Sequence, residues 1–257
     1  MKTITRIIIV ILINIVTLSA AQALEISATL HWSKRVELGT PVNGVIKEVN
    51  VDIGQRIAKD TVLVSLDARG YRAAQSKARA NVKHLKEAWL EAKRERDRAK
   101  ELYERTVLSD RDLQLALNAL TSAESAHLTA KAELVQAELN LEYSSLRAPF
   151  DAIVLKRNAE VGQTVVSELK PEVLVVIAAS DQMIARGLIS ASHLNGDIHG
   201  QSATVKVDGL SYQGKVKHIG LEPVNTGKQD KHYEIEIVFT TGQRILRAGQ
   251  QATINLP

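Results

Sequence analysis

The sequence predicts an α+β fold in which a long antiparallel α-helical hairpin interrupts a β-sandwich, together with a small β-barrel domain. Three observations predict it. Residues 68–143 are rich in helix formers, and no glycine or proline occurs between Gly70 and Pro149. A β-rich segment before this stretch is repeated after it. From about residue 180, the chain changes to short alternating runs separated by turn residues.

Residues 1–23 have the pattern of a secretory signal peptide. Lys2 and Arg6 give a positive start, residues 7–18 form an apolar run, and residues 21–23 form a small-x-small cleavage site. An uncleaved membrane anchor is the alternative. The chain contains no cysteine, which excludes disulfides, thiol chemistry and a lipid-modified N-terminal cysteine. Because a secretory signal peptide directs export, we expect the mature chain, after cleavage, outside the cytoplasm.

The internal repeat predicts a split domain. Residues 41–57 reappear as residues 149–165, and each copy holds a Gly-Gln pair, at Gly54 and Gly162, where glycine supplies a positive φ. Each copy then continues into a further apolar run, at 62–66 and at 173–177. Neither copy could bury its apolar face alone. We therefore expect residues 40–67 and 144–179 to form one β-sandwich.

Residues 68–143 predict the hairpin, because their apolar positions repeat every seven residues in each half, as in a coiled coil. The first half has one seam of Tyr71, Ala78, Leu85, Ala92 and Ala99 and another of Val82, Trp89 and Tyr103; the second half alternates Leu113, Leu120, Leu134 and Leu141 with Ala116, Ala123, Ala130 and Ala137.

The two halves also match each other. In an antiparallel pair of helices, the residue numbers of two facing residues add up to the same value along the whole pair. Ala78 and Ala137 have the same sum of residue numbers as Ala99 and Ala116. This register places the turn between Val107 and Leu108, with Ser109 or Asp110 as the cap of the second helix. Trp89 is expected near the small Ala126, and His127 is expected to be a structural seam residue. Two separate core helices are the alternative.

The pattern of residues 180–257 predicts a β-barrel domain, and we expect residues 24–39 to belong to the same domain. Short strands are expected at 184–189, 203–207, 214–219, 233–239 and 252–256. The loose alternation of residues 25–38 predicts a further strand, which we expect to complete the barrel.

These features resemble the periplasmic adaptor, or membrane fusion protein, family of tripartite efflux pumps, of the HlyD-like and RND-type adaptors. In that family a split lipoyl/biotinyl-like β-sandwich is interrupted by a long antiparallel α-helical coiled-coil hairpin. The family's channel-binding motif, R-x-x-x-L-x-x-x-x-x-x-S, is matched by Arg98, Leu102 and Ser109. Thr106 to Leu108 stand where the family often has a glycine, so a differently shaped turn is expected. Gln250 stands where the family's barrel commonly has methionine.

The resemblance implies a non-enzymatic periplasmic adaptor, associated with the inner membrane through the pump complex. It would link an inner-membrane transporter of RND or ABC type to an outer-membrane channel protein. A homo-oligomer, a ring of adaptors, is expected in the assembled pump. Longer adaptors have a membrane-proximal domain, and this chain, which stops at Pro257, resembles a reduced form. The alternative is a secreted coiled-coil scaffold unrelated to transport.

The sequence favours neither catalysis nor a cofactor. The seven histidines are dispersed and no pair has the i, i+4 spacing of a helical metal site, so no metal ligand is expected. A carrier domain for lipoate or biotin needs an acceptor lysine at its central turn, and residues 66–70 contain none. A net charge of +4 without a clustered basic face gives no reason to expect a nucleic-acid partner.

Overall fold

The structure, a computed structural model, describes residues 24–167, 172–194, 198–224, 230–242 and 244–257. The predicted signal peptide, residues 1–23, lies outside the described residues. Two compact units divide the chain: residues 24–35 with Ala178–Pro257 form one, and Val36–Ile177 form the other. In the part of the chain described, no helix combines the length and the apolar character needed to cross a membrane.

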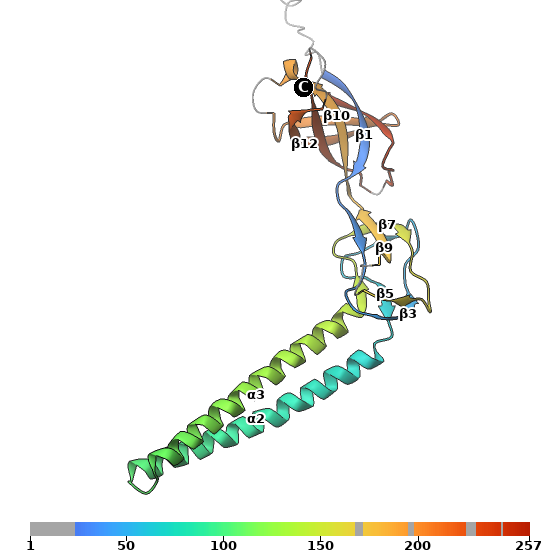
Figure 1. The fold of residues 1–257 in the computed structure, drawn as a ribbon. Coiled ribbons are helices and arrows are strands. Elements are labelled where there is room, and N and C mark those ends of the chain that lie inside the picture. Colours follow the sequence, from blue (N-terminus) through green and yellow to red (C-terminus); the bar gives the residue numbers. More distant parts are fainter. Residues whose placement is uncertain (1–23, 168–171, 195–197, 225–229, 243) are drawn as a thin grey trace, which may run out of the picture. The chain divides into compact units, whose positions relative to one another are not determined.

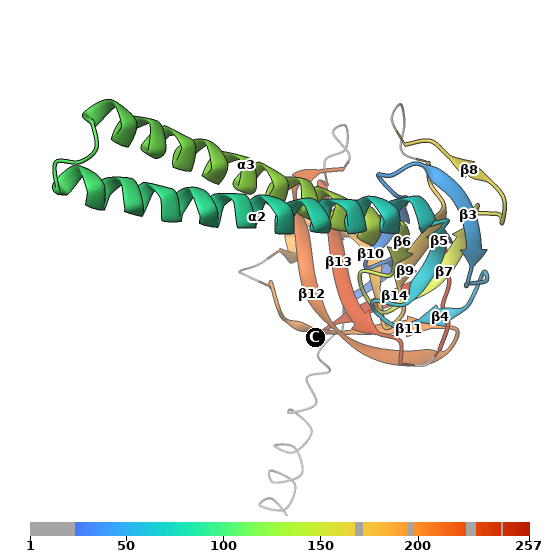
Figure 2. The same ribbon diagram turned by 90° about the horizontal axis from the view of Figure 1, so that it is seen from below.

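The hairpin consists of α2 (Arg69–Glu104) and α3 (Asp110–Tyr143), which lie side by side in Figures 1 and 2. Burial follows the predicted seams, since the half-buried residues of α2 recur every seven positions and Ala130 of α3 is buried. One position differs. Tyr103, expected in the seam, is 41% exposed, whereas the neighbouring Leu102 is half-buried. The α2 chain ends one residue after Tyr103, and the loop passes back over Leu102, whose carbonyl accepts from Val107.

An aromatic stack lies in the hairpin interface. The rings of Trp89 and His127 are parallel within 9°, with centroids 5.6 Å apart. The sequence placed Trp89 near Ala126, and the structure stacks it on the ring of the next residue, His127. His127 Nδ1 is buried, and no described group makes a hydrogen bond with it. Arg96, in the same seam, is half-buried and pairs with Asp97.

The split β-sandwich is built from both copies of the repeat. One sheet has the order β6-β5-β3-β8 and the other the order β2-β9-β7-β4. The strands are β2 (Arg35–Leu38), β3 (Gly44–Val49), β4 (Arg56–Ile57), β5 (Val62–Leu66), β6 (Ser145–Arg147), β7 (Ala152–Arg157), β8 (Thr164–Val165) and β9 (Val175–Ala179).

The pairing of these strands is reciprocal. Gly44 of β3 pairs with Val165 of β8, and the corresponding residue of the second copy, Ala152 of β7, pairs with Ile57 of β4. The short strand of each copy, β4 or β8, thus pairs with a longer strand of the other copy. The core is shared in the same way, with Ile46 and Leu63 from the first copy packed in one cluster with Val154 from the second. The two copies therefore bury their apolar side chains in one shared core.

The same hydrogen-bonding pattern occurs in three Gly-Gln turns. Gly54, Gly162 and Gly249 have φ of 85°, 88° and 88°. In each turn the glutamine side chain accepts from the backbone N–H three residues earlier, at 3.0 Å for Gln55, 3.0 Å for Gln163 and 2.6 Å for Gln250. The last of these lies in the barrel, where Gln250 also donates to Asp208.

The barrel is closed, with the strand order β1-β10-β13-β12-β11-β14. The strands are β1 (Leu24–Trp32), β10 (Gln182–Ser190), β11 (Ser202–Val207), β12 (Leu210–Pro223), β13 (His232–Thr240) and β14 (Gln251–Leu256). β1 pairs with β10 on one side and β14 on the other, so residues 24–32 complete the barrel as expected. The expected single strand at 25–38 is instead two strands, and β2 pairs with β9 of the sandwich. The alternation of side chains continues across this change of sheet, so it could not mark the boundary.

Candidate functional site

The far end of the hairpin is a short turn made by helix-capping hydrogen bonds. The N–H of Val107 donates to the carbonyl of Leu102, and that of Thr106 donates to Tyr103, both at 2.9 Å. This pair of bonds is the Schellman motif, which usually has glycine where Thr106 stands. Thr106 has a φ of 60°, in the left-handed region. The turn is therefore made without glycine, at the expense of strain at a β-branched residue.

Arg98 lies on α2 and has a side chain that is 63% exposed. Its guanidinium pairs with the Glu95 carboxylate one turn earlier on the same helix. The guanidinium of Arg98 thus has a partner on its own helix. An exposed pair of this kind contributes little to stability, so a partner protein could replace Glu95 at small cost.

The sequence predicted Ser109 or Asp110 as the cap of the second helix, and Ser109 is the N-cap of α3. Its hydroxyl oxygen accepts from the N–H of Asp112 at 3.2 Å and donates to the Asp112 carboxylate at 2.6 Å. Asp110 and Asp112 place negative charge at the positive end of the helix dipole. The hydroxyl of Ser109 is exposed, but its hydrogen bonds serve its own helix.

The three residues of the motif lie near one another along the chain at the tip, but they are not joined. Arg98 and Leu102 are one helical turn apart on the same side of α2. Ser109 begins the other helix, and none of the described hydrogen bonds or ion pairs links it to Arg98. Sequence analysis missed Val107, which is 69% exposed at the end of the hairpin. Its signal was a β-branched residue directly after the last turn of a helix.

The base of the hairpin is held on the sandwich by polar contacts. Thr40 Oγ1 donates to the carbonyl of Tyr143 at 2.7 Å, and the Tyr71 hydroxyl donates to the carbonyl of Asn43. The Arg69 guanidinium beside Asp67 lowers the pKa of that carboxyl to about 2. These contacts fix where both helices leave the domain.

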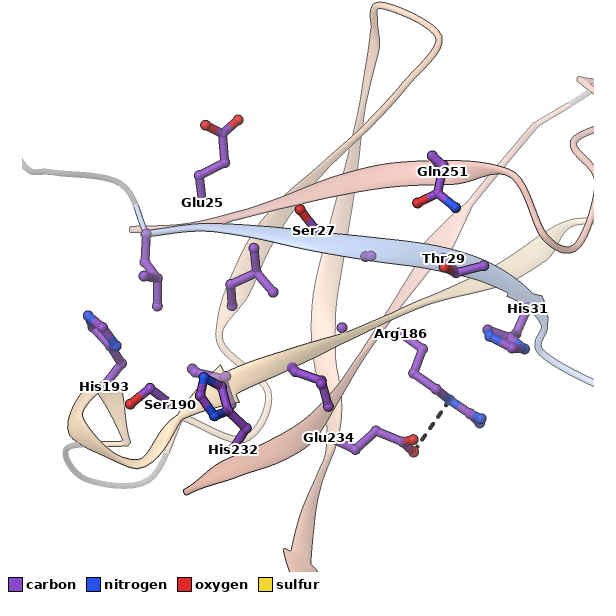
Figure 3. A pocket seen from close by; sticks show the side chains of 16 residues that line it. Glu25, Ser27, Thr29, His31, Arg186, Ser190, His193, His232, Glu234 and Gln251 are labelled. Atoms are coloured by element: carbon purple, nitrogen blue, oxygen red, sulfur yellow. Dashed lines mark ion pairs between the residues drawn. The ribbon is translucent and has the colours of Figure 1, made fainter. Parts of the chain in front are cut away.

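A second candidate site is a groove of about 700 Å³ on the barrel surface (Figure 3). It lies over β1, β10, β13 and β14, and it has Ser190, His193 and His232 toward one end and His31 toward the other. Arg186 pairs with Glu234 at 3.3 Å within the groove. Alternation along these strands predicts which residues point outward, but it gives no sign that they gather in one groove.

Arg186 also joins the groove to a charged network. It donates to Glu236 at 2.7 Å, and Lys217 lies 3.7 Å from the same carboxylate. Burial raises the pKa of Glu236, but the hydrogen bond and charge of Arg186, with Lys217 and His218, outweigh it and lower the pKa overall. Glu236 therefore stays ionised and anchors the cations beside it. The described residues hold no group of three or more histidine or carboxylate side chains suited to a metal ion.

Comparison with known proteins gives a family match. Residues 34–179 match the family model of the CzcB-like barrel-sandwich hybrid domain. The chain is 25% identical over 226 residues to the cobalt-zinc-cadmium resistance protein CzcB of Cupriavidus metallidurans, covering 83% of this chain and 40% of that protein. It is 28% identical over 159 residues to the efflux pump periplasmic linker BepD of Brucella suis, covering 61% of this chain and 40% of that protein.

Among solved structures, the fold resembles the membrane fusion protein Spr0693 of Streptococcus pneumoniae. The TM-score is 0.67 at 18% identity, covering 91% of this chain and 98% of that one. This likeness concerns the fold alone. The chain spans 40% of the length of CzcB and of BepD.

Proposed function

The chain belongs to the family of the CzcB-like barrel-sandwich hybrid domain, and from this membership we propose that it is a periplasmic adaptor subunit of a tripartite efflux transporter. It would link an inner-membrane pump to an outer-membrane channel. The observation that carries the proposal is the insertion of α2 and α3 between paired strands β5 and β6 of that domain. A rigid pair of helices, 36 and 34 residues long, gives such a domain a long reach.

The parts of the chain have separate roles in this proposal. Residues 1–23 would be a signal peptide that directs the chain to the periplasm. The hairpin of residues 68–143 would be a coiled coil, projecting from the split lipoyl-like domain of residues 40–67 and 144–179. The barrel domain would meet the inner-membrane transporter, of RND or ABC type. Several copies would form a ring in the assembled pump, and the adaptor would act as a linker without catalysing a reaction.

The outer-membrane channel would dock at the tip, on Arg98, Leu102 and Ser109. Support comes from the spacing of these residues, from the exposed guanidinium of Arg98 and from the exposed Val107 between the helices. A guanidinium can bind carbonyls or a carboxylate of the partner with charge-assisted hydrogen bonds. Val107 and the half-buried Leu102 would give the contact an apolar centre.

The test is efflux in cells that lack the native adaptor. Arg98→Asp is expected to abolish complementation, because it puts repulsion where a charge-assisted contact is expected. Leu102→Asp would bury a charge in the contact and should behave in the same way. Ethidium accumulation and growth in zinc, cobalt or cadmium salts are the measurements, with the periplasmic level of each variant checked by immunoblot.

Matched controls separate docking from folding. Arg94 forms the same kind of ion pair with Glu91 one turn nearer the base, so Arg94→Asp loses an equal local contact and should retain efflux. Ser109→Arg should block docking, whereas Ser109→Asn preserves a capping side chain and should retain it. If Arg98→Asp and Leu102→Asp both complement like wild type, channel docking at the tip is wrong, and the scaffold alternative becomes the better explanation.

A further inference from the structure

No buried side chain of the hairpin fastens it to the sandwich from which it projects. Both helices lie entirely within the described residues, and no residue of α2 is buried. On α3 only Ala130 is buried, well away from the base. The hairpin is therefore attached by its two chain junctions, at residues 67–69 and 143–145, and by polar contacts around them. Two junctions alone would leave a rigid pair of helices free to swing about the line that joins them.

A short segment of the sandwich contacts both helices at this base. Residues 39–43, which we call the strap, connect β2 to β3. Thr40 Oγ1 donates at 2.7 Å to the carbonyl of Tyr143, the last residue of α3. The Tyr71 hydroxyl of α2 donates to the carbonyl of Asn43. Because the Tyr71 side chain projects from the side of its helix, this bond lies off the line of the two junctions and opposes a swing.

The strap is also fixed from its other side. Ser167 Oγ donates to the carbonyl of Thr40 at 2.6 Å, and the N–H of Ser167 donates to Asn43 Oδ1 at 2.8 Å. Gly39 packs so closely on the carbonyl of Glu172 that a Cβ on Gly39 would lie 2.4 Å from that oxygen. Thr40, between these contacts, is only 4% exposed. The strap therefore has little room to move without its neighbours.

The outer anchors of the strap lie on the two chain segments that lead to the barrel domain. Gly39 follows β2, which the chain reaches from β1 of the barrel. Glu172 precedes β9, from which the chain continues into β10 of the barrel. The N–H of Leu174 donates to the carbonyl of Leu38 at 2.8 Å, so these two segments are bonded to each other. The strap thus joins both segments to the bases of both helices.

We propose that the strap couples the segments leading to the barrel to the angle at which the hairpin leaves the sandwich. A displacement at Gly39 or Glu172 moves Thr40 and Asn43, and the bonds of these two residues move the helices. The hairpin amplifies the displacement. With 36 residues, α2 is about 54 Å long, and packed helices lie about 10 Å apart, so a shift of about 1 Å at the strap would move the tip by about 5 Å.

Distances between two spin labels, measured by double electron–electron resonance, test the coupling. The absence of native cysteines allows labels at chosen positions of the full-length chain. One label is attached at Lys93→Cys on α2, and the second at Lys59→Cys or Lys156→Cys in the sandwich, which are all exposed positions. Dilution with unlabelled chain restricts the measurement to distances within one copy. A swing of the hairpin changes at least one of the two distances.

Removal of the bonds between the strap and the helices is the first measurement. Thr40→Val with Tyr71→Phe removes both hydroxyls and preserves the shape of both side chains. We expect the distribution of at least one distance to become about twofold broader. The matched control is Thr129→Val with Tyr143→Phe, because Thr129 donates only to Ser125 of its own helix and the Tyr143 hydroxyl makes no described hydrogen bond. A distribution as narrow as that of the control would overturn the proposal.

Gly39→Ala is the second measurement, because Gly39 has no described hydrogen bond to either helix. The new Cβ must move away from the Glu172 carbonyl, so the strap shifts. Lys93 lies about 36 Å along α2, so the mean of at least one distance should shift by about 3 Å. In a chain that also carries Thr40→Val and Tyr71→Phe, Gly39→Ala should cause no shift, since the coupling is gone. No shift in the native background, or an equal shift in both backgrounds, would refute the coupling.

Two further variants complete the test. Gly187→Ala places a Cβ 2.8 Å from Ile26 in the barrel, so it is a comparable steric change outside the strap and should leave both distances unchanged. Ser167→Ala answers the case in which Gly39→Ala does not fold, because it removes the bond to the Thr40 carbonyl without adding volume. It should broaden the same distribution, and an unchanged width would also count against the proposal. Because the assay uses the purified chain, its outcome is independent of the efflux test of the adaptor role.

Discussion

Thr106 adopts a backbone conformation that β-branched residues avoid. Its φ of 60° costs about 1–2 kcal/mol for a residue with a side chain, whereas glycine adopts it freely. Glycine also loses more entropy on folding, by about 0.5–1 kcal/mol, which offsets part of the gain. We predict that Thr106→Gly stabilises the hairpin by about 0.5–1 kcal/mol. Thermal unfolding followed by circular dichroism is the measurement, and Thr106→Ala, which keeps the Cβ, should change it much less. A lower midpoint for the glycine variant would contradict this account.

At the same scale, sequence reasoning narrowed the cap of α3 to Ser109 or Asp110, but it did not give the hydrogen bonds of the Ser109 hydroxyl. Cap identity follows from a short local pattern, so it can be predicted. The bond from Ser109 to Asp112 and the pairing of Arg98 with Glu95 depend on rotamers, which spacing does not determine. The same limit applies to the stack of Trp89 on His127. The heptad repeat predicted that Trp89 and His127 lie at similar positions along the hairpin, but it did not show that their rings would stack.

At the scale of elements, the hairpin depends on a layer of small residues. Ala130 is 1% exposed and is buried against α2, whereas Ala132, two residues later, is exposed. Ala130→Leu is predicted to cost about 1–3 kcal/mol, because a larger side chain in a packed layer forces the helices apart. Ala132→Leu should be nearly silent, since both residues are good helix formers. Denaturant unfolding followed at 222 nm compares them. Equal costs at the two positions would show that the small layer does not face α2.

The elements themselves were largely predictable, because their periods are local. The heptads gave both helices, and the alternating runs gave five strands of the barrel within a few residues. The break between β1 and β2 was missed, since both strands keep one alternating pattern while they join different sheets. The prediction that Tyr103 lies in the seam was wrong, because a period cannot show where the capping turn ends the contact between helices.

For the whole molecule, the strand pairing shows how the hairpin is attached. Ser65 of β5 pairs with Ser145 of β6, so the chain leaves and re-enters the sandwich at neighbouring positions. We predict that replacing residues 69–142 by a short Gly/Ser loop leaves a folded β-protein, because strands so close need only a few linking residues. Circular dichroism and a cooperative thermal transition are the measurements. Loss of cooperative unfolding would mean that the sandwich needs the helices for its own stability.

The repeat of residues 41–57 at 149–165 made the split domain predictable at this scale, because two half-domains must share one core. The groove over β1, β10, β13 and β14 was not predictable in the same way. Its side chains come from strands far apart in the sequence, and only closure of the barrel brings them together.

Attachment at adjacent strands makes the hairpin a spacer of adjustable length. Adding seven residues to each helix at the same height would preserve both seams, the capping turn and the junction with β5 and β6. Each such step would move the tip by about 10 Å. The fold thus lets evolution, or an engineer, match one domain to gaps of different width, in increments set by the helix repeat.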